Sequence, residues 1–241
     1  MATKKSYDYQ SAFDIIGPVM MGPSSSHTAG AVKIGNATFN VLGGIKPETL
    51  AIHYYESFAK THQGHGTDLA IVGGAMGYST FDSRIKDSLT IANDLGIHVD
   101  IIEEDGESIG EHPNCAYLIA EANGRHIEVI GNSIGGGTIK LRRISVEGID
   151  VNFNHGLPIL VMDGSKNKSE VNHFLNDVNE LGVSIDEELV DTDDDNSLVV
   201  LPLTKAIKES TLNQIKEKYN HLNISLSLIH ISEPTRPRLI S

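Results

Sequence analysis

The sequence predicts an α+β protein of two units, and three observations lead to this class. Strand-like and helical segments are mixed along residues 1–147. Residues 155–225 follow a strand–helix–strand–strand–helix–strand order, which is the order of a ferredoxin-like module. A length of 241 residues is sufficient for two modest cores. We expect the boundary between the units within residues 147–154.

The first unit is expected to begin with an extended lead-in and a helix. Residues 11–18 are short and apolar around Gly and Pro, which disfavours a long helix. Residues 28–42 carry apolar side chains at near-helical spacing, and Gly43-Gly44 ends the run. This pattern predicts a helix whose first turn carries Ser26-His27-Thr28.

A strand over residues 50–55 is expected next, followed by two helices. Residues 58–77 predict a helix that is entered through a loop of Gly and His at residues 61–68. Residues 83–95 show an amphipathic pattern that stops at a glycine, so they predict a second helix. A strand over residues 97–102 should follow it.

The middle of the chain predicts a hairpin and one further strand. Residues 116–122 and 127–130 are strand-like, and Asn123-Gly124 between them is typical of a tight turn. Glycines are concentrated in residues 131–137. Apolar residues then alternate through residues 138–144, as in a half-buried strand.

The second unit is interpreted as four strands and two helices. The acidic segment 191–196 could be a calcium loop, but it lacks the spaced Gly and the terminal Glu of such loops, so we interpret it as a solvated turn. The expected elements are strands at 157–162, 182–185, 197–203 and 222–224, with helices at 169–181 and 206–219.

Residues 226–241 differ in character from the rest of the chain. They resemble the conceptual translation of a transposase adapter used in preparing sequencing libraries. We therefore expect a non-native tail there and exclude it from fold reasoning.

The composition excludes several classes of protein. No apolar run approaches the roughly 20 residues of a membrane span, and Asp14 interrupts the N-terminal segment before a signal-peptide core can form. A net charge of −13 with scattered Lys and Arg disfavours nucleic-acid binding. Cys115 is the single cysteine, so this chain alone can form neither an intrachain disulfide nor a cysteine-based metal cage. We expect a cytoplasmic protein.

The first candidate site is the hydroxyl-rich segment Ser24-Ser25-Ser26-His27-Thr28. It lies at a predicted junction of loop and helix, where free backbone N–H groups and positive partial charge suit a carboxylate or phosphate. A Ser/Thr helix cap with a chance histidine is the simpler alternative.

Three histidines form the second candidate site. His62 and His65 lie among glycines just before Thr67-Asp68, and His112 precedes Pro113-Asn114. Active sites favour loops held by a rigid scaffold, although each histidine alone is better explained as structural. A zinc site built from all three is the alternative, and we favour a metal-free polar pocket because the spacing fixes no tetrahedral geometry.

Residues 131–135 match the G-x-S-x-G pattern of serine hydrolases around Ser133. That motif requires a strand, a sharp turn and then a helix. Here two more glycines and an alternating strand follow, so we interpret the segment as a hinge or a close backbone approach. A hydrolase that uses Ser133 is the third hypothesis on function.

These motifs occur in the order of a known family. Residues 13–18, followed by Gly22-Pro23-Ser24-Ser25-Ser26-His27-Thr28, resemble the opening of the beta chain of iron-sulfur-dependent L-serine dehydratases. Residues 64–68, 112–114 and 133–137 resemble later motifs of that family. The similarity spans residues 8–224 and includes an ACT-like second unit.

The resemblance implies conversion of L-serine to pyruvate and ammonia, a carbon–nitrogen lyase reaction of amino-acid catabolism and gluconeogenesis. It implies a 4Fe-4S cluster held by the cysteines of an alpha subunit, no metal ligand in this chain and no pyridoxal phosphate. The single Cys115 agrees with this division, because such a cluster needs several thiolates. The first unit would resemble the allosteric substrate-binding domain of phosphoglycerate dehydrogenases.

The resemblance also implies roles for individual residues. Ser24, Ser25, Ser26, His27, Thr28 and Asn114 would bind L-serine at the subunit interface. His65, oriented by Thr67 or Asp68, is the candidate acid/base, and His112 is a second one.

Two further expectations concern partners. The ACT-like unit would support self-association, whereas effector binding is in doubt because residues 163–166 lack the Pro-Gly pair common in such modules. The alternative to a catalytic subunit is a non-catalytic, serine-sensing regulatory subunit.

Overall fold

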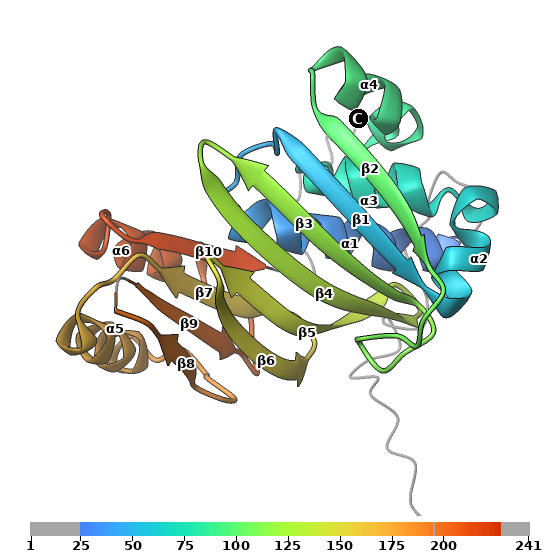
Figure 1. Cartoon of the computed structure of the whole chain (residues 1–241). Coiled ribbons are helices and arrows are strands. Elements are labelled where there is room, and N and C mark those ends of the chain that lie inside the picture. Colours follow the sequence, from blue (N-terminus) through green and yellow to red (C-terminus); the bar gives the residue numbers. More distant parts are fainter. Residues whose placement is uncertain (1–24, 195, 228–241) are drawn as a thin grey trace, which may run out of the picture.

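The computed structural model describes residues 25–194 and 196–227, which form two β-sheets with helices packed against them (Figure 1). The predicted α+β class is therefore confirmed. None of the described helices is long and apolar enough to cross a membrane.

The larger sheet has six strands in the order β2-β1-β3-β4-β5-β6. Strands β1 and β2 are parallel, and every other neighbouring pair is antiparallel. The strands are β1 (Thr49–Tyr55), β2 (His98–Glu104), β3 (Cys115–Ala122), β4 (Arg125–Gly135), β5 (Thr138–Val146) and β6 (Ile149–His155).

Tight turns join the antiparallel strands. Asn123 and Gly124 both have positive φ, 52° and 74°, which confirms the predicted hairpin between β3 and β4. Glu147 and Gly148 repeat this geometry between β5 and β6, with φ of 52° and 85°. Strand β6 thus occupies the segment in which the sequence predicted only a boundary between units.

Helices cover one face of the larger sheet. They are α1 (Ser25–Val41), α2 (Glu56–His65), α3 (Thr67–Ala75), the short 3₁₀ helix η2 (Ser83–Asp87) and α4 (Ser88–Asp94). The predicted loop over residues 61–68 is wrong, because residues 61–65 form the last turn of α2. Gly66, with φ of 67°, is a single-residue joint between α2 and α3.

The smaller sheet has four antiparallel strands in the order β10-β7-β9-β8. Its strand–helix–strand–strand–helix–strand order agrees with the prediction, but the strand expected at residues 182–185 is wrong. Only a single bridge, from Ile185 to Leu203, forms there. The elements are β7 (Ile159–Asp163), α5 (Lys168–Glu180), β8 (Leu189–Thr192), β9 (Ser197–Pro202), α6 (Glu209–Lys218) and β10 (Asn223–Ser227).

The exclusion of residues 226–241 needs one correction. Leu226 and Ser227 belong to β10 and pair with Leu160 and Ile159 of β7, so the ordered fold extends past the expected end. The rest of that tail, residues 228–241, lies outside the described residues, as does the lead-in at 11–18.

The two sheets share a core. Ile159 and Val161 of β7 join the apolar cluster of the first unit, whereas Leu160 and Met162, on the opposite face, pack with α5 and α6. Because β7 is buried on both faces, the smaller sheet lies between the larger sheet and its own helices. This arrangement fixes the units relative to each other.

Candidate functional site

The site is built on the contact between α1 and α3. A Cβ atom on Gly35 would lie 2.2 Å from the carbonyl oxygen of Ile71, and one on Gly74 would lie 2.2 Å from that of Val32. The two backbones therefore touch, which only glycine permits. The Asn36 side chain crosses the contact and donates to the carbonyls of Gly74 (3.1 Å) and Tyr78 (2.9 Å).

The contact also fixes the direction of the helices. Val32 lies against Gly74, and Phe39, further along α1, lies against Gly77, further along the chain. Helices α1 and α3 therefore run the same way, and their N-terminal ends lie at one end of the pair. Thr28 lies in the first turn of α1, and Thr67 is the first residue of α3.

Two N-terminal helix ends at one place form a region of positive partial charge. The free N–H groups and the dipoles of both helices favour an anion there. Thr28 and Thr67 bury their side chains at this end, with 6% and 1% exposed. The prediction that the first turn of a helix carries residues 26–28 is confirmed. Ser24 lies outside the described residues, and so do the side chains of Ser25, Ser26 and His27.

The hairpin between β4 and β5 packs on the same end of α1. Lys33 of α1 donates from Nζ to the carbonyl of Gly137 at 2.5 Å. A Cβ on Gly137 would lie 2.9 Å from that of Ala29, and one on Gly30 would lie 2.2 Å from Oγ of Ser133. The close backbone approach expected for this glycine run is confirmed. No helix follows Ser133, since β4 continues into the hairpin.

The loop that carries His112 and Asn114 is attached to β4 beside this hairpin. The Ser133 backbone N–H donates to the carbonyl of Asn114 at 2.9 Å. The Asn114 N–H donates to Nδ1 of His112 at 3.1 Å, which requires an unprotonated Nδ1. Burial lowers the pKa of His112, with Glu56 opposing this shift. His112 is therefore a neutral imidazole at pH 7.

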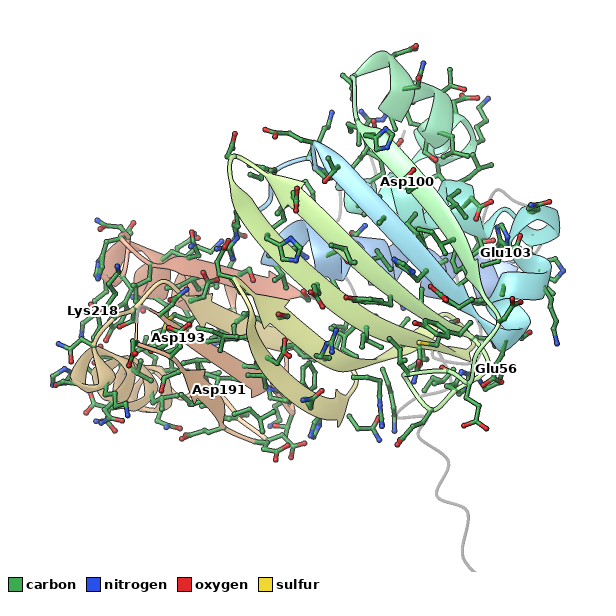
Figure 2. The ribbon with its side chains drawn as sticks, viewed as in Figure 1. Glu56, Asp100, Glu103, Asp191, Asp193 and Lys218 are labelled. Carbon is green, nitrogen blue, oxygen red and sulfur yellow. The ribbon has the colours of Figure 1, made fainter. Side chains whose placement is uncertain are left out.

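His62 forms the strongest polar cluster near the site. Its ring is 3% exposed; Nδ1 lies 2.8 Å and 2.9 Å from the two carboxylate oxygens of Asp68, and Nε2 lies 2.8 Å from Glu103. The ring also stacks on Tyr54, with centroids 4.8 Å apart. Burial alone lowers the pKa of His62, but the hydrogen bonds to Glu103 and Asp68 outweigh it, and the net pKa is raised. Figure 2 shows Glu103 at the end of β2, beside α2.

His65, the acid/base candidate, is the last residue of α2 and lies half-buried before the Gly66 joint. Asp68, expected to orient His65, lies within hydrogen-bond distance of His62. On sequence alone, His62 belongs to the three-histidine candidate site, and the acid/base role is assigned to His65 and His112. Its i, i+6 spacing to Asp68 across a helix joint carries no recognisable signal.

Metal ligands are not assembled in the described part of the chain. No three His, Cys, Asp or Glu side chains within residues 25–194 and 196–227 are placed to hold an ion. Cys115 is fully buried, and burial raises the pKa of its thiol. Asp191 and Thr192 belong to β8, so the turn predicted at 191–196 begins two residues later than expected. Asp191 and Asp193 lie on the opposite side of the molecule from Glu56 (Figure 2).

Comparisons with known proteins agree with this set of motifs. A sequence model of the family described as serine dehydratase beta chain matches residues 11–95. A probable L-serine dehydratase beta chain of Bacillus subtilis is 44% identical over 158 residues, which are 66% of this chain and 70% of that relative. The L-serine dehydratase beta chain of Peptoniphilus asaccharolyticus is 36% identical over 69% of this chain and 73% of its own length. L-serine dehydratase TdcG of Escherichia coli is 40% identical over 81 residues, only 18% of that protein.

Proposed function

Because this chain belongs to the family of L-serine dehydratase beta chains, we propose that it is one subunit of an enzyme that converts L-serine to pyruvate and ammonia. The structural observation that carries the proposal is the convergence of the N-terminal ends of α1 and α3. Helix α1, which begins within the motif at 24–28, packs against α3, which begins within the motif at 64–68, and against the hairpin that carries the motif at 133–137.

The converged helix ends bind the substrate carboxylate. Backbone N–H groups of the first turns, with the hydroxyls of Ser24, Ser25, Ser26 and Thr28, would hold it, and His27 would add a ring donor. Thr67 would contribute from α3, and Asn114 from the neighbouring loop. A carboxylate held in this way fixes the orientation of the α carbon, which is the atom that must lose a proton.

His65 is the proposed acid/base, because it ends α2 directly beside the first turn of α3. His112 is the second candidate, since its neutral ring can accept a proton at pH 7. Asp68 would act indirectly, by joining the first turn of α3 to His62.

This chain does not fit an iron-sulfur cluster. Such a cluster needs several thiolates, and the single Cys115 is buried within the sheet. We therefore assign the 4Fe-4S cluster to an alpha subunit, with no pyridoxal phosphate, and assign to this chain only substrate binding and proton transfer.

Residues 155–225 are proposed as an ACT-like module, and residues 1–147 as the dehydratase unit. The order β10-β7-β9-β8 with α5 and α6 on one face supports the module. The first unit is proposed to resemble the substrate-binding domain of phosphoglycerate dehydrogenases. Self-association would use an exposed strand edge. Val190 of β8 is 43% exposed, so Val190→Lys should lower the oligomeric state measured by light scattering; an unchanged mass contradicts this interface.

The function is tested by reconstitution. The chain is co-expressed anaerobically with a cysteine-bearing alpha subunit, and pyruvate formation from L-serine is measured. His65→Ala should abolish turnover and leave the cluster absorbance intact, whereas His98→Ala, at an exposed position on β2, should change neither. Serine binding without any contribution to the turnover of the partner would favour the regulatory alternative.

A further inference from the structure

Ser133 carries a buried hydroxyl, and Ser133 is not among the residues proposed above to bind the substrate. Its side chain is 1% exposed, and Oγ has no hydrogen-bond partner among the described residues. Native proteins pair nearly all buried polar groups, because an unpaired one loses its bonds to water without replacement. An unpaired buried hydroxyl beside a candidate site therefore points to a ligand.

Irregular backbone on both sides of Ser133 sets the direction of its side chain. Strand register shifts occur on both sides of Ser133, between Ile130 and Gly131 and between Ser133 and Gly135. Such bulges re-aim a side chain and are common next to active sites. The Ser133 N–H is anchored on the carbonyl of Asn114 at 2.9 Å.

The hydroxyl faces the first turns of α1. A Cβ on Gly30 would lie 2.2 Å from Oγ of Ser133, so only glycine leaves room at that position. Lys33, one turn further along α1, holds the same hairpin through the carbonyl of Gly137. The hairpin and the helix therefore keep Ser133 against the end of α1 that carries the anion site.

Ser133 does not have the surroundings of a nucleophile. A catalytic serine needs a base within hydrogen-bond reach, and no described side chain reaches this Oγ. A hydroxyl without an internal acceptor can donate to an incoming one. The acceptor that this end of α1 favours is an anion, because the helix N–H groups point toward it.

We propose that Ser133 is a further substrate-binding residue, whose hydroxyl donates a hydrogen bond to the carboxylate of the amino-acid substrate held at the N-terminal ends of α1 and α3. This proposal rests on the proposed function. It deepens that function by adding a donor from the sheet to the donors from the two helices.

The test is Ser133→Ala in the reconstituted complex, with Ser227→Ala as the matched control. Ser227 is also buried, with 2% exposed and an unpaired Oγ, but it lies on β10 of the other sheet. Steady-state kinetics with L-serine give KM and kcat. Thermal melts of each complex, with and without L-serine, give stability and binding independently of turnover.

We expect Ser133→Ala to raise KM about tenfold, which is the effect of losing one hydrogen bond to a charged group. Its kcat should stay within about twofold, because the bond is made to bound substrate before and during reaction. The melting temperature without L-serine should be unchanged or higher, since an unpaired hydroxyl is removed, and the L-serine-induced rise should shrink. Ser227→Ala should leave KM and the induced rise unchanged.

Unchanged KM in Ser133→Ala overturns the proposal, and so does a loss of kcat with a lower melting temperature, as disturbed packing would give. If the unmutated complex shows neither turnover nor an L-serine-induced rise, the proposed function fails together with this inference. If the unmutated complex is active and only the Ser133 effect is missing, this inference alone fails.

Discussion

The guanidinium of Arg125 and the carboxylate of Asp163 form two parallel hydrogen bonds of 2.7 Å each between the two sheets. Arg125 begins β4 and Asp163 ends β7; the Asp163 side chain is buried, and the Arg125 side chain is 16% exposed. Arg125 also donates to the carbonyl of Val41 at 2.8 Å, and Asn223 donates to Asp163 at 3.0 Å. One ion pair therefore joins the larger sheet, the end of α1 and the smaller sheet.

Breaking this ion pair should strongly destabilise the chain. Arg125→Ala leaves the Asp163 carboxylate buried without its charged partner, a loss of about 3–5 kcal/mol in unfolding free energy. Chemical denaturation measures it. Arg84→Ala is the control, because Arg84 forms a similar forked pair with Asp82 at the surface and should show no measurable change. Equal effects at the two positions would show that burial does not set the strength of these pairs.

Much of the fold could be predicted from the sequence, because the apolar residues of most strands and helices recur at the spacing typical of that element. The failures have local causes. Strand β6 was missed although Ile149, Val151 and Phe153 alternate with exposed residues, because polar residues dominate the segment. The prediction of a loop over residues 61–68 is wrong although glycines are typical of loops. Gly66 alone forms the joint between the helices, and packing on the sheet keeps the preceding turn helical.

The site could be predicted only as a list of motifs. The positions of these motifs relative to one another depend on the contact between Gly35 and Gly74. These two glycines are 39 positions apart, and the need for glycine becomes visible only when the two helices pack. The sequence predicts that a strand and not a helix follows Ser133, which the structure confirms, but the unpaired hydroxyl of Ser133 is a property of the packed structure. The hydrogen-bond partners of His62 are likewise a property of the packed structure.

His62 should make stability depend on pH in a defined direction. Its folded pKa is raised above the ordinary value of 6.5, so the folded chain binds the proton more tightly than the unfolded one. The stabilisation from the contacts with Asp68 and Glu103 is then complete below pH 6.5 and is lost as pH rises through the folded pKa. The difference in unfolding free energy between the unmutated chain and His62→Gln should be largest in acid and shrink toward alkaline pH. A difference that grows with pH contradicts a charged His62.

His112 should act with the opposite sign. Burial lowers its folded pKa, so the unfolded chain binds the proton more tightly, and the stability that neutral His112 provides is lost as pH falls from 6.5 through the folded pKa. Protonation of Nδ1 would also remove the acceptor of the Asn114 N–H. Relative to His112→Gln, the unmutated chain should lose stability below pH 6.5 in denaturation measurements. If the unfolding free energies of the two chains change with pH in the same way, neutral His112 does not stabilise the folded chain.

The contact between α1 and α3 predicts opposite outcomes for the same substitution at different helical glycines. In Gly35→Ala the new methyl would meet the carbonyl of Ile71 at 2.2 Å, which is backbone and cannot rotate away, so the helices must separate. We expect a loss of about 1–3 kcal/mol, as for overpacked cores, and a raised KM for L-serine because the two N-terminal ends move apart. Gly64→Ala, inside α2, meets no atom within 4 Å. It should gain roughly 0.5–1 kcal/mol in unfolding free energy, because alanine restricts the unfolded chain more than glycine does. Chemical denaturation measures the unfolding free energy of both variants. If both variants lose a similar amount, the fold requires glycine in these helices for a reason other than the close approach of the two backbones.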